Sequence, residues 1–125
     1  MGGLAFTETL TGTLRLARDP ARERPVSLSY RALTGPLRAF LQRPALSIEG
    51  AIDAEGLAAH RHLRGSLALV ARPERALDQA FSFTADDGLL LAFHGSRPLR
   101  PGALGLLAGA FTDARGQVVA RALLR

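Results

Sequence analysis

A chain of 125 residues, 47% of them hydrophobic, is long enough for one domain with a single core and too apolar to be disordered. It contains no cysteine, which excludes disulfides, thiolate metal sites and a cysteine nucleophile. The formal net charge is +5 and the pI is near 11.4, a balance that can indicate nucleic-acid binding. All sixteen basic residues are arginines, scattered rather than clustered among aromatic residues, so we expect no nucleic-acid partner.

The start of the chain lacks the pattern of a signal peptide, and no apolar run approaches the length of a membrane span. We therefore expect a cytoplasmic protein without a membrane span, forming one domain over residues 1–125. Heavy use of alanine, leucine, glycine and arginine, with no lysine or asparagine, is typical of a GC-rich genome.

Alternation of apolar and polar residues predicts eight short strands. In chain order they cover residues 6–16, 26–32, 46–53, 63–69, 77–83, 89–95, 106–111 and 117–124. One helix is predicted over residues 35–42. Thr34 or Gly35 can cap it, Pro36 suits its first turn, and one face is shared by Leu37, Phe40 and Leu41. The segments 17–25 and 97–105 are rich in proline and charge or glycine, and they are predicted to be loops.

Five glycines recur inside these strands on the apolar side: Gly12, Gly50, Gly65, Gly95 and Gly109. A glycine in the middle of a strand marks a bend, a bulge or a close approach of another backbone. Five on one face predict a strongly coiled sheet. With tight turns between antiparallel strands, they favour a mainly β protein, either an up-and-down, lipocalin-like barrel or a curled sandwich.

The order of the motifs Phe6-Thr7-Glu8-Thr9, Leu37-x-x-Phe40-Leu41, Ile48-x-Gly50-x-Ile52, Leu63-x-Gly65-x-Leu67 and Phe81-x-Phe83-Thr84-x-x-x-Gly88 carries a family resemblance. Over roughly residues 4–113 the chain resembles the small β-rich domain found beside cholesterol-oxidase-like members of the bacterial glucose-methanol-choline flavin oxidoreductases. Ser96 after Gly95, with no lysine following, departs from that pattern. The resemblance implies an accessory domain near lipid or sterol chemistry, with an oxidoreductase partner and no catalytic residues. No dinucleotide fingerprint is present, and we expect no cofactor.

Three polar residues lie in phase with the apolar face: Glu8 between Phe6 and Leu10, Tyr30 after Leu28, and Gln79 before Phe81. One interpretation is a ligand-binding pocket in which Glu8, Tyr30 and Gln79 hold the polar end of an apolar molecule. The other is that Glu8 and Gln79 reach water near strand ends while Tyr30 is an ordinary core residue. A carboxylate inside an apolar core is costly unless it is paired or hydrogen-bonded, so the first interpretation requires a partner for Glu8.

Other candidate chemistry is weaker. His60, His62 and His94 have spacing that could bind zinc, but all are predicted to point outward beside arginines, and we expect no metal. Asp86 and Asp87 read as turn residues before Gly88 rather than catalytic carboxylates, and no Gly-x-Ser-x-Gly motif is present.

The sequence thus favours a non-catalytic β-barrel that binds a lipid, sterol or other apolar small molecule, and we expect no enzyme. The alternative is an interaction module or homodimer with a filled core. In that case the outward side chains of Leu90, Leu106 and Val118 or Val119 would be buried against a partner.

Overall fold

The computed structural model describes residues 5–33, 45–70, 74–100 and 103–125. These residues form nine strands and contain no helix. The strands are β1 (Ala5–Leu16), β2 (Asp19–Leu33), β3 (Ala45–Ala54), β4 (Ala58–Val70), β5 (Ala76–Thr84), β6 (Leu90–Arg100), β7 (Ala103–Leu104), β8 (Leu107–Thr112) and β9 (Val118–Leu124). The helix predicted over residues 35–42 lies outside the described residues.

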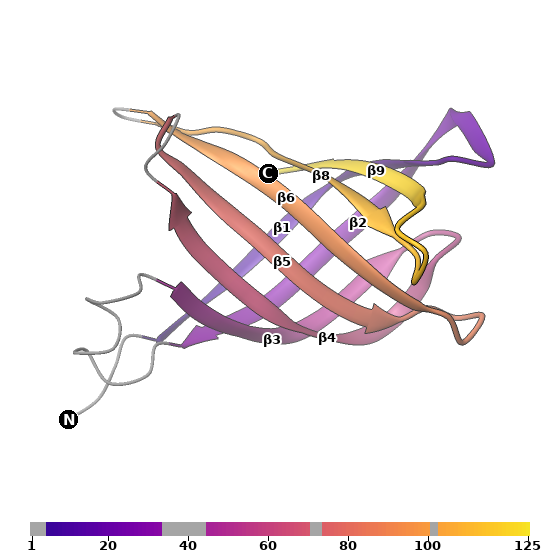
Figure 1. Ribbon diagram of the computed structural model, residues 1–125, viewed down its shortest axis with the longest axis horizontal. Helices are drawn as coiled ribbons and strands as arrows, with labels where there is room; N and C mark the ends of the chain where they lie inside the picture. Colours follow the sequence, from indigo (N-terminus) through magenta and orange to yellow (C-terminus); the bar gives the residue numbers. More distant parts are fainter. Residues whose placement is uncertain (1–4, 34–44, 71–73, 101–102) are drawn as a thin grey trace.

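Eight strands close into an antiparallel barrel (Figure 1). Strands β1 to β6 pair in sequence order, β8 pairs with β6, and β9 pairs with both β8 and β1, which closes the ring. The two-residue strand β7 forms a small hairpin with the end of β6. The mainly β, up-and-down barrel is therefore confirmed. Closure pairs the edges that an open sheet of this length would leave exposed.

Two predicted loops are wrong. Most of the segment 17–25 belongs to β2, because its prolines lie where β2 pairs only with β1; pairing with β3 starts at Val26. A strand tolerates proline where one edge needs no donor. Likewise Arg97 to Arg100 continue β6, and Pro98 follows the last β6–β8 pair at Ser96. Strands β2 and β6 are therefore longer than the composition of these segments suggested.

The inward glycines allow neighbouring strands to approach closely. A Cβ atom built on Gly65 would lie 1.9 Å from the carbonyl oxygen of Ala80 and 2.5 Å from Cα of Phe81. A Cβ on Gly12 would lie 1.8 Å from the carbonyl oxygen of Leu123. No real side chain fits at these distances, so glycine is required where the wall coils most tightly, as the sequence predicted.

The barrel has two different ends. At the hairpin end lie the β1–β2, β3–β4, β5–β6 and β8–β9 turns, and glycines with positive φ close three of them: Gly56, Gly88 and Gly116. At the amino-terminal end, β1, β3 and β5 begin and β2, β4 and β6 finish (Figure 1).

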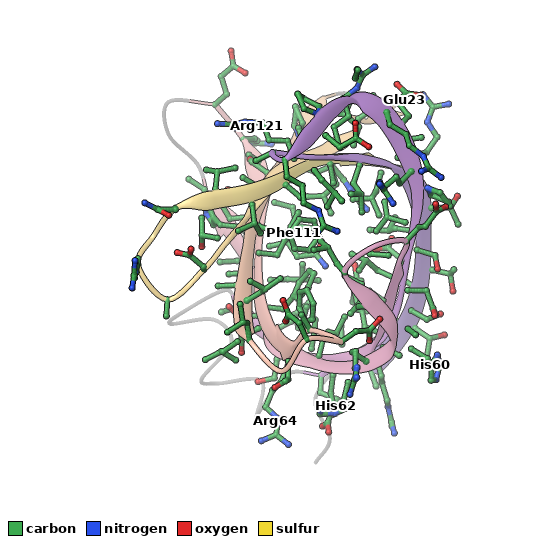
Figure 2. The ribbon with its side chains drawn as sticks, turned by 90° about the vertical axis from the view of Figure 1, so that its right-hand side faces the viewer. Glu23, His60, His62, Arg64, Phe111 and Arg121 are labelled. Carbon is green, nitrogen blue, oxygen red and sulfur yellow. The ribbon has the colours of Figure 1, made fainter. Side chains whose placement is uncertain are left out.

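Four phenylalanines fill the interior between β5, β6 and β8: Phe81, Phe83, Phe93 and Phe111. Phe93 stacks on Phe81 and packs at a tilted angle against Phe111, with ring centroids 4.9 Å apart in both pairs. Figure 2, which looks at the molecule from the hairpin end, shows Phe111 pointing into the barrel while His60, His62 and Arg64 point away from it. The interior here is a packed aromatic core rather than a channel.

Candidate functional site

The three polar residues predicted to face inward meet inside the barrel. Glu8 of β1 is the direct cross-strand partner of Tyr30 in β2, and the Tyr30 hydroxyl donates a hydrogen bond to Glu8 Oε1. Tyr30 and Gln79 are buried, whereas the Glu8 side chain retains 27% exposure. Their predicted inward orientation is confirmed for Tyr30 and Gln79, and Glu8 forms the link between this cluster and solvent.

A fourth member of the cluster, Arg97 of β6, was missed by sequence reasoning. Its guanidinium contacts Glu8 through Nη1 to Oε2 at 3.4 Å and Nη2 to Oε1 at 3.5 Å, and its side chain is only 6% exposed. The signal was present, because Arg97 continues the inward alternation of Leu91, Phe93 and Gly95. The predicted strand ended at Gly95, and Arg97 was assigned to the loop that follows it. We call Glu8, Tyr30, Gln79 and Arg97 the polar cluster.

Charge within the polar cluster is balanced. The Arg97 guanidinium and the Glu8 carboxylate form one ion pair across the barrel interior. Burial raises the pKa of Tyr30 well above its ordinary value, and the hydrogen bond to Glu8 raises it further. The phenol therefore stays protonated and acts as a donor at any physiological pH.

The side-chain amide of Gln79 is a buried donor that makes no hydrogen bond within the polar cluster. Gln79 is 2% exposed, and no acceptor among the described residues lies in hydrogen-bonding geometry with its Nε2. The amide does lie near enough to the Tyr30 oxygen to lower the pKa of that phenol slightly against the larger effects that raise it. A buried amide without a partner costs roughly 1–3 kcal/mol of stability. Such a group is expected where an additional molecule supplies the acceptor.

Beyond the polar cluster, towards the amino-terminal end, the inward side of the strands carries apolar side chains that are partly exposed. Phe6 lies two residues before Glu8 and is 43% exposed, and Leu69 is 50% exposed. Leu77 is half-buried, pairs with both Leu69 and Arg97, and packs against the core. We call this set of side chains the apolar rim: Phe6, Leu46, Leu69, Leu77 and Leu99. Apolar side chains with a few convergent polar groups are the residue types that usually line a small-molecule site.

Of the hollows lined by described residues, two lie on the outer surface of the barrel. The larger, of about 680 Å³, runs between the projecting β1–β2 hairpin and the outer faces of β8 and β9. Its lining combines small apolar residues, such as Ala108 and Ala110, with charged ones that include Arg15, Glu23 and Arg121. We call it the outer groove. The smaller, of about 500 Å³, lies over β2, β3 and β4 beside Arg31, Glu49 and Arg64.

The histidines lie on the outside, as predicted. His62 Nε2 lies 2.8 Å from Glu49, His60 Nδ1 lies 3.3 Å from Asp53, and His94 points outward from β6. Over the described ranges no group of three or more histidine, aspartate or glutamate side chains could hold a metal ion. Asp87 accepts a hydrogen bond from the backbone N–H of Leu89 within the β5–β6 turn, as expected for a turn residue.

Comparisons with models of protein families, with curated proteins and with solved structures found no match to this chain. In the part of the chain that the structure describes, no helix is long and apolar enough to cross a membrane.

Proposed function

We propose that this protein is a non-catalytic barrel that binds one small amphiphilic molecule at its amino-terminal end. The polar end of the ligand accepts a hydrogen bond from Gln79, and its apolar part packs on the apolar rim. The observation that carries this proposal is the buried, unpartnered Nε2 of Gln79 in the polar cluster inside the barrel. Glu8 marks the route of entry, since it is the member of the polar cluster that retains contact with solvent.

The amide of Gln79 also bears on stability. Replacing it with leucine removes a buried polar group and leaves a side chain of similar volume, so the ligand-free Gln79→Leu variant is expected to be more stable than the parent. A residue that lowers stability and can be replaced by a hydrophobic one has the character of a binding residue.

The family resemblance noted above adds a ligand class to the proposal. We propose that the ligand is a lipid or a sterol-like molecule, and that the protein serves as an accessory domain to a lipid-modifying oxidoreductase. The apolar rim supports this choice, because its partly exposed leucines and phenylalanine suit a hydrocarbon body.

A thermal-unfolding screen tests the proposal. Medium-chain fatty acids, their methyl esters, the matching alcohols and sterols are added at increasing concentration, and binding raises the melting temperature by mass action. Gln79→Leu should abolish the shift for those that bind. Gln117→Leu is the matched control, because Gln117 is an exposed residue preceding β9. The proposal fails if no amphiphile shifts the melting temperature, or if Gln79→Leu responds as the parent does.

A second candidate function is homodimerisation through the outer face of β6, β8 and β9. Three of the apolar residues predicted to point outward are exposed: Leu90 at 60%, Leu106 at 40% and Val118 at 37%. Val119 instead packs against the core. Leu123 adds to this face at 50% exposure and borders the outer groove. Light scattering with the parent and with Leu123→Arg decides: a dimer that the substitution dissociates supports this function, and a monomeric parent rules it out.

A further inference from the structure

The charges of the polar cluster determine which polar end a ligand can present. Glu8 carries one negative charge and Arg97 one positive charge, and the two groups already contact each other. Tyr30 is protonated and directs its proton to Glu8. Gln79 Nε2 is the buried donor of this cluster that has no acceptor among the described residues, and it is uncharged. The site therefore offers a hydrogen bond but no net charge.

We propose that the ligand's polar end is an uncharged hydrogen-bond acceptor, such as the carbonyl of an ester or ketone or a hydroxyl oxygen, and that carboxylates are rejected. This inference rests on the binding function proposed above. An ionised ligand carboxylate beside Gln79 would lose its hydration in a low-dielectric interior and find no free cation, because Glu8 already neutralises Arg97. A neutral acceptor loses less hydration free energy and satisfies the unpartnered amide.

The test compares ligands that differ only in charge. A medium-chain fatty acid and its methyl ester share the same hydrocarbon chain, and their affinities for the parent protein are measured by calorimetry at neutral pH. The ester is expected to bind at least about tenfold more tightly, the ratio that corresponds to one pKa unit of desolvation cost for the ionised carboxylate. Equal affinities, or tighter binding of the acid, would overturn the inference and leave the binding function intact. Absence of binding by both would overturn the binding function as well.

The Glu8→Gln substitution is expected to reverse the preference, so that the same site favours the acid over the ester. The amide can still accept from Tyr30, but Arg97 loses its counter-ion and becomes free to pair with a ligand carboxylate. The acid should gain at least about tenfold in affinity and overtake the ester.

Glu49→Gln is the matched control, because it removes the same charge from the outer face of β3. It should leave the preference for the ester unchanged. If Glu8→Gln also leaves that preference unchanged, the charge of Glu8 does not select the ligand. The parent measurement needs no variant, so it decides the question even if Glu8→Gln does not fold.

Discussion

The ultraviolet absorbance of Tyr30 reports on the polar cluster without overlap from other residues, because the chain has one tyrosine and no tryptophan. Its pKa is raised, first by burial and then by the hydrogen bond to Glu8. Because the pKa of Tyr30 is raised in the folded state, this residue contributes to the free energy of unfolding. The contribution is fully present below the ordinary tyrosine pKa of about 10 and is lost as pH rises beyond it.

We therefore expect no phenolate absorbance in the folded protein slightly above pH ~10, and a melting temperature that falls with further increase in pH. Ultraviolet absorbance during an alkaline titration measures the first, and thermal unfolding at each pH measures the second. A phenol that ionises at its ordinary pKa while the barrel remains folded would show that Tyr30 is not held as described.

The Arg97–Glu8 pair can be tested by a double-mutant cycle. Arg97→Met leaves the partly buried Glu8 carboxylate without its cation and should destabilise the protein by about 1–3 kcal/mol, less than for a fully buried pair because Glu8 reaches solvent. Adding Glu8→Gln removes the orphaned charge and should restore stability to within about 1 kcal/mol of the parent. Denaturant unfolding of the four proteins measures both values, and additive losses would contradict the pairing.

At the level of single strands, the close approach at Gly65 fixes the shape of the wall. Gly65→Ala should destabilise the barrel by about 2–4 kcal/mol, because its Cβ would meet the backbone of β5 rather than a side chain that can move. Ser66→Ala, at the adjacent exposed position, is the control and should stay within about 0.5 kcal/mol of the parent. If the two variants melt together, the coiling of β4 against β5 is not as described.

Asp86, in the β5–β6 turn, connects this hairpin to the β3–β4 hairpin through hydrogen bonds. Its Oδ1 accepts from the backbone N–H of Ala59 at 3.0 Å and from Arg61 Nε at 2.8 Å, and the bond with Arg61 is the main cause of its lowered pKa. A lowered pKa in the folded state gives stability that is present above the unfolded-state pKa and is lost as pH falls through the folded-state value.

Asp86→Asn should therefore lower the melting temperature at neutral pH and lessen its fall under acidic conditions. Asp87→Asn serves as the control, since that carboxylate bonds within its own turn. Thermal unfolding across the acidic range measures both variants. An Asp86→Asn protein with the parent's pH dependence would contradict this role.

Much of this architecture could be predicted from local patterns. Two-residue alternation located eight strands, and the inward phase of Glu8, Tyr30 and Gln79 located three members of the polar cluster. The true ends of β2 and β6, which continue through prolines, could not be predicted. Whether a proline destabilises a strand depends on whether its missing N–H faces a paired neighbour, and the local sequence does not show this. The contact between Glu8 and Arg97, 89 residues apart, follows from barrel closure, which alternation does not encode.

For the molecule as a whole, the barrel divides its interior between a packed aromatic end and an end with a polar cluster and an apolar rim. The closed ring of strands keeps both in place, and the long β1–β2 hairpin lies outside this division, over the outer groove. Binding inside the amino-terminal end and binding in the outer groove are therefore distinguishable by which residues respond.

The most direct measurement is a nuclear magnetic resonance titration of the isotope-labelled protein with a medium-chain methyl ester. The chain has three glutamines, Gln42, Gln79 and Gln117, and no asparagine, so few side-chain amide signals compete. We expect the signals of the Gln79 amide pair, Tyr30 and Arg97 to shift strongly, while the signal of Gln117 does not change. An unshifted Gln79 amide, with changes confined to Arg15, Arg121 and the rest of the outer groove, would contradict it.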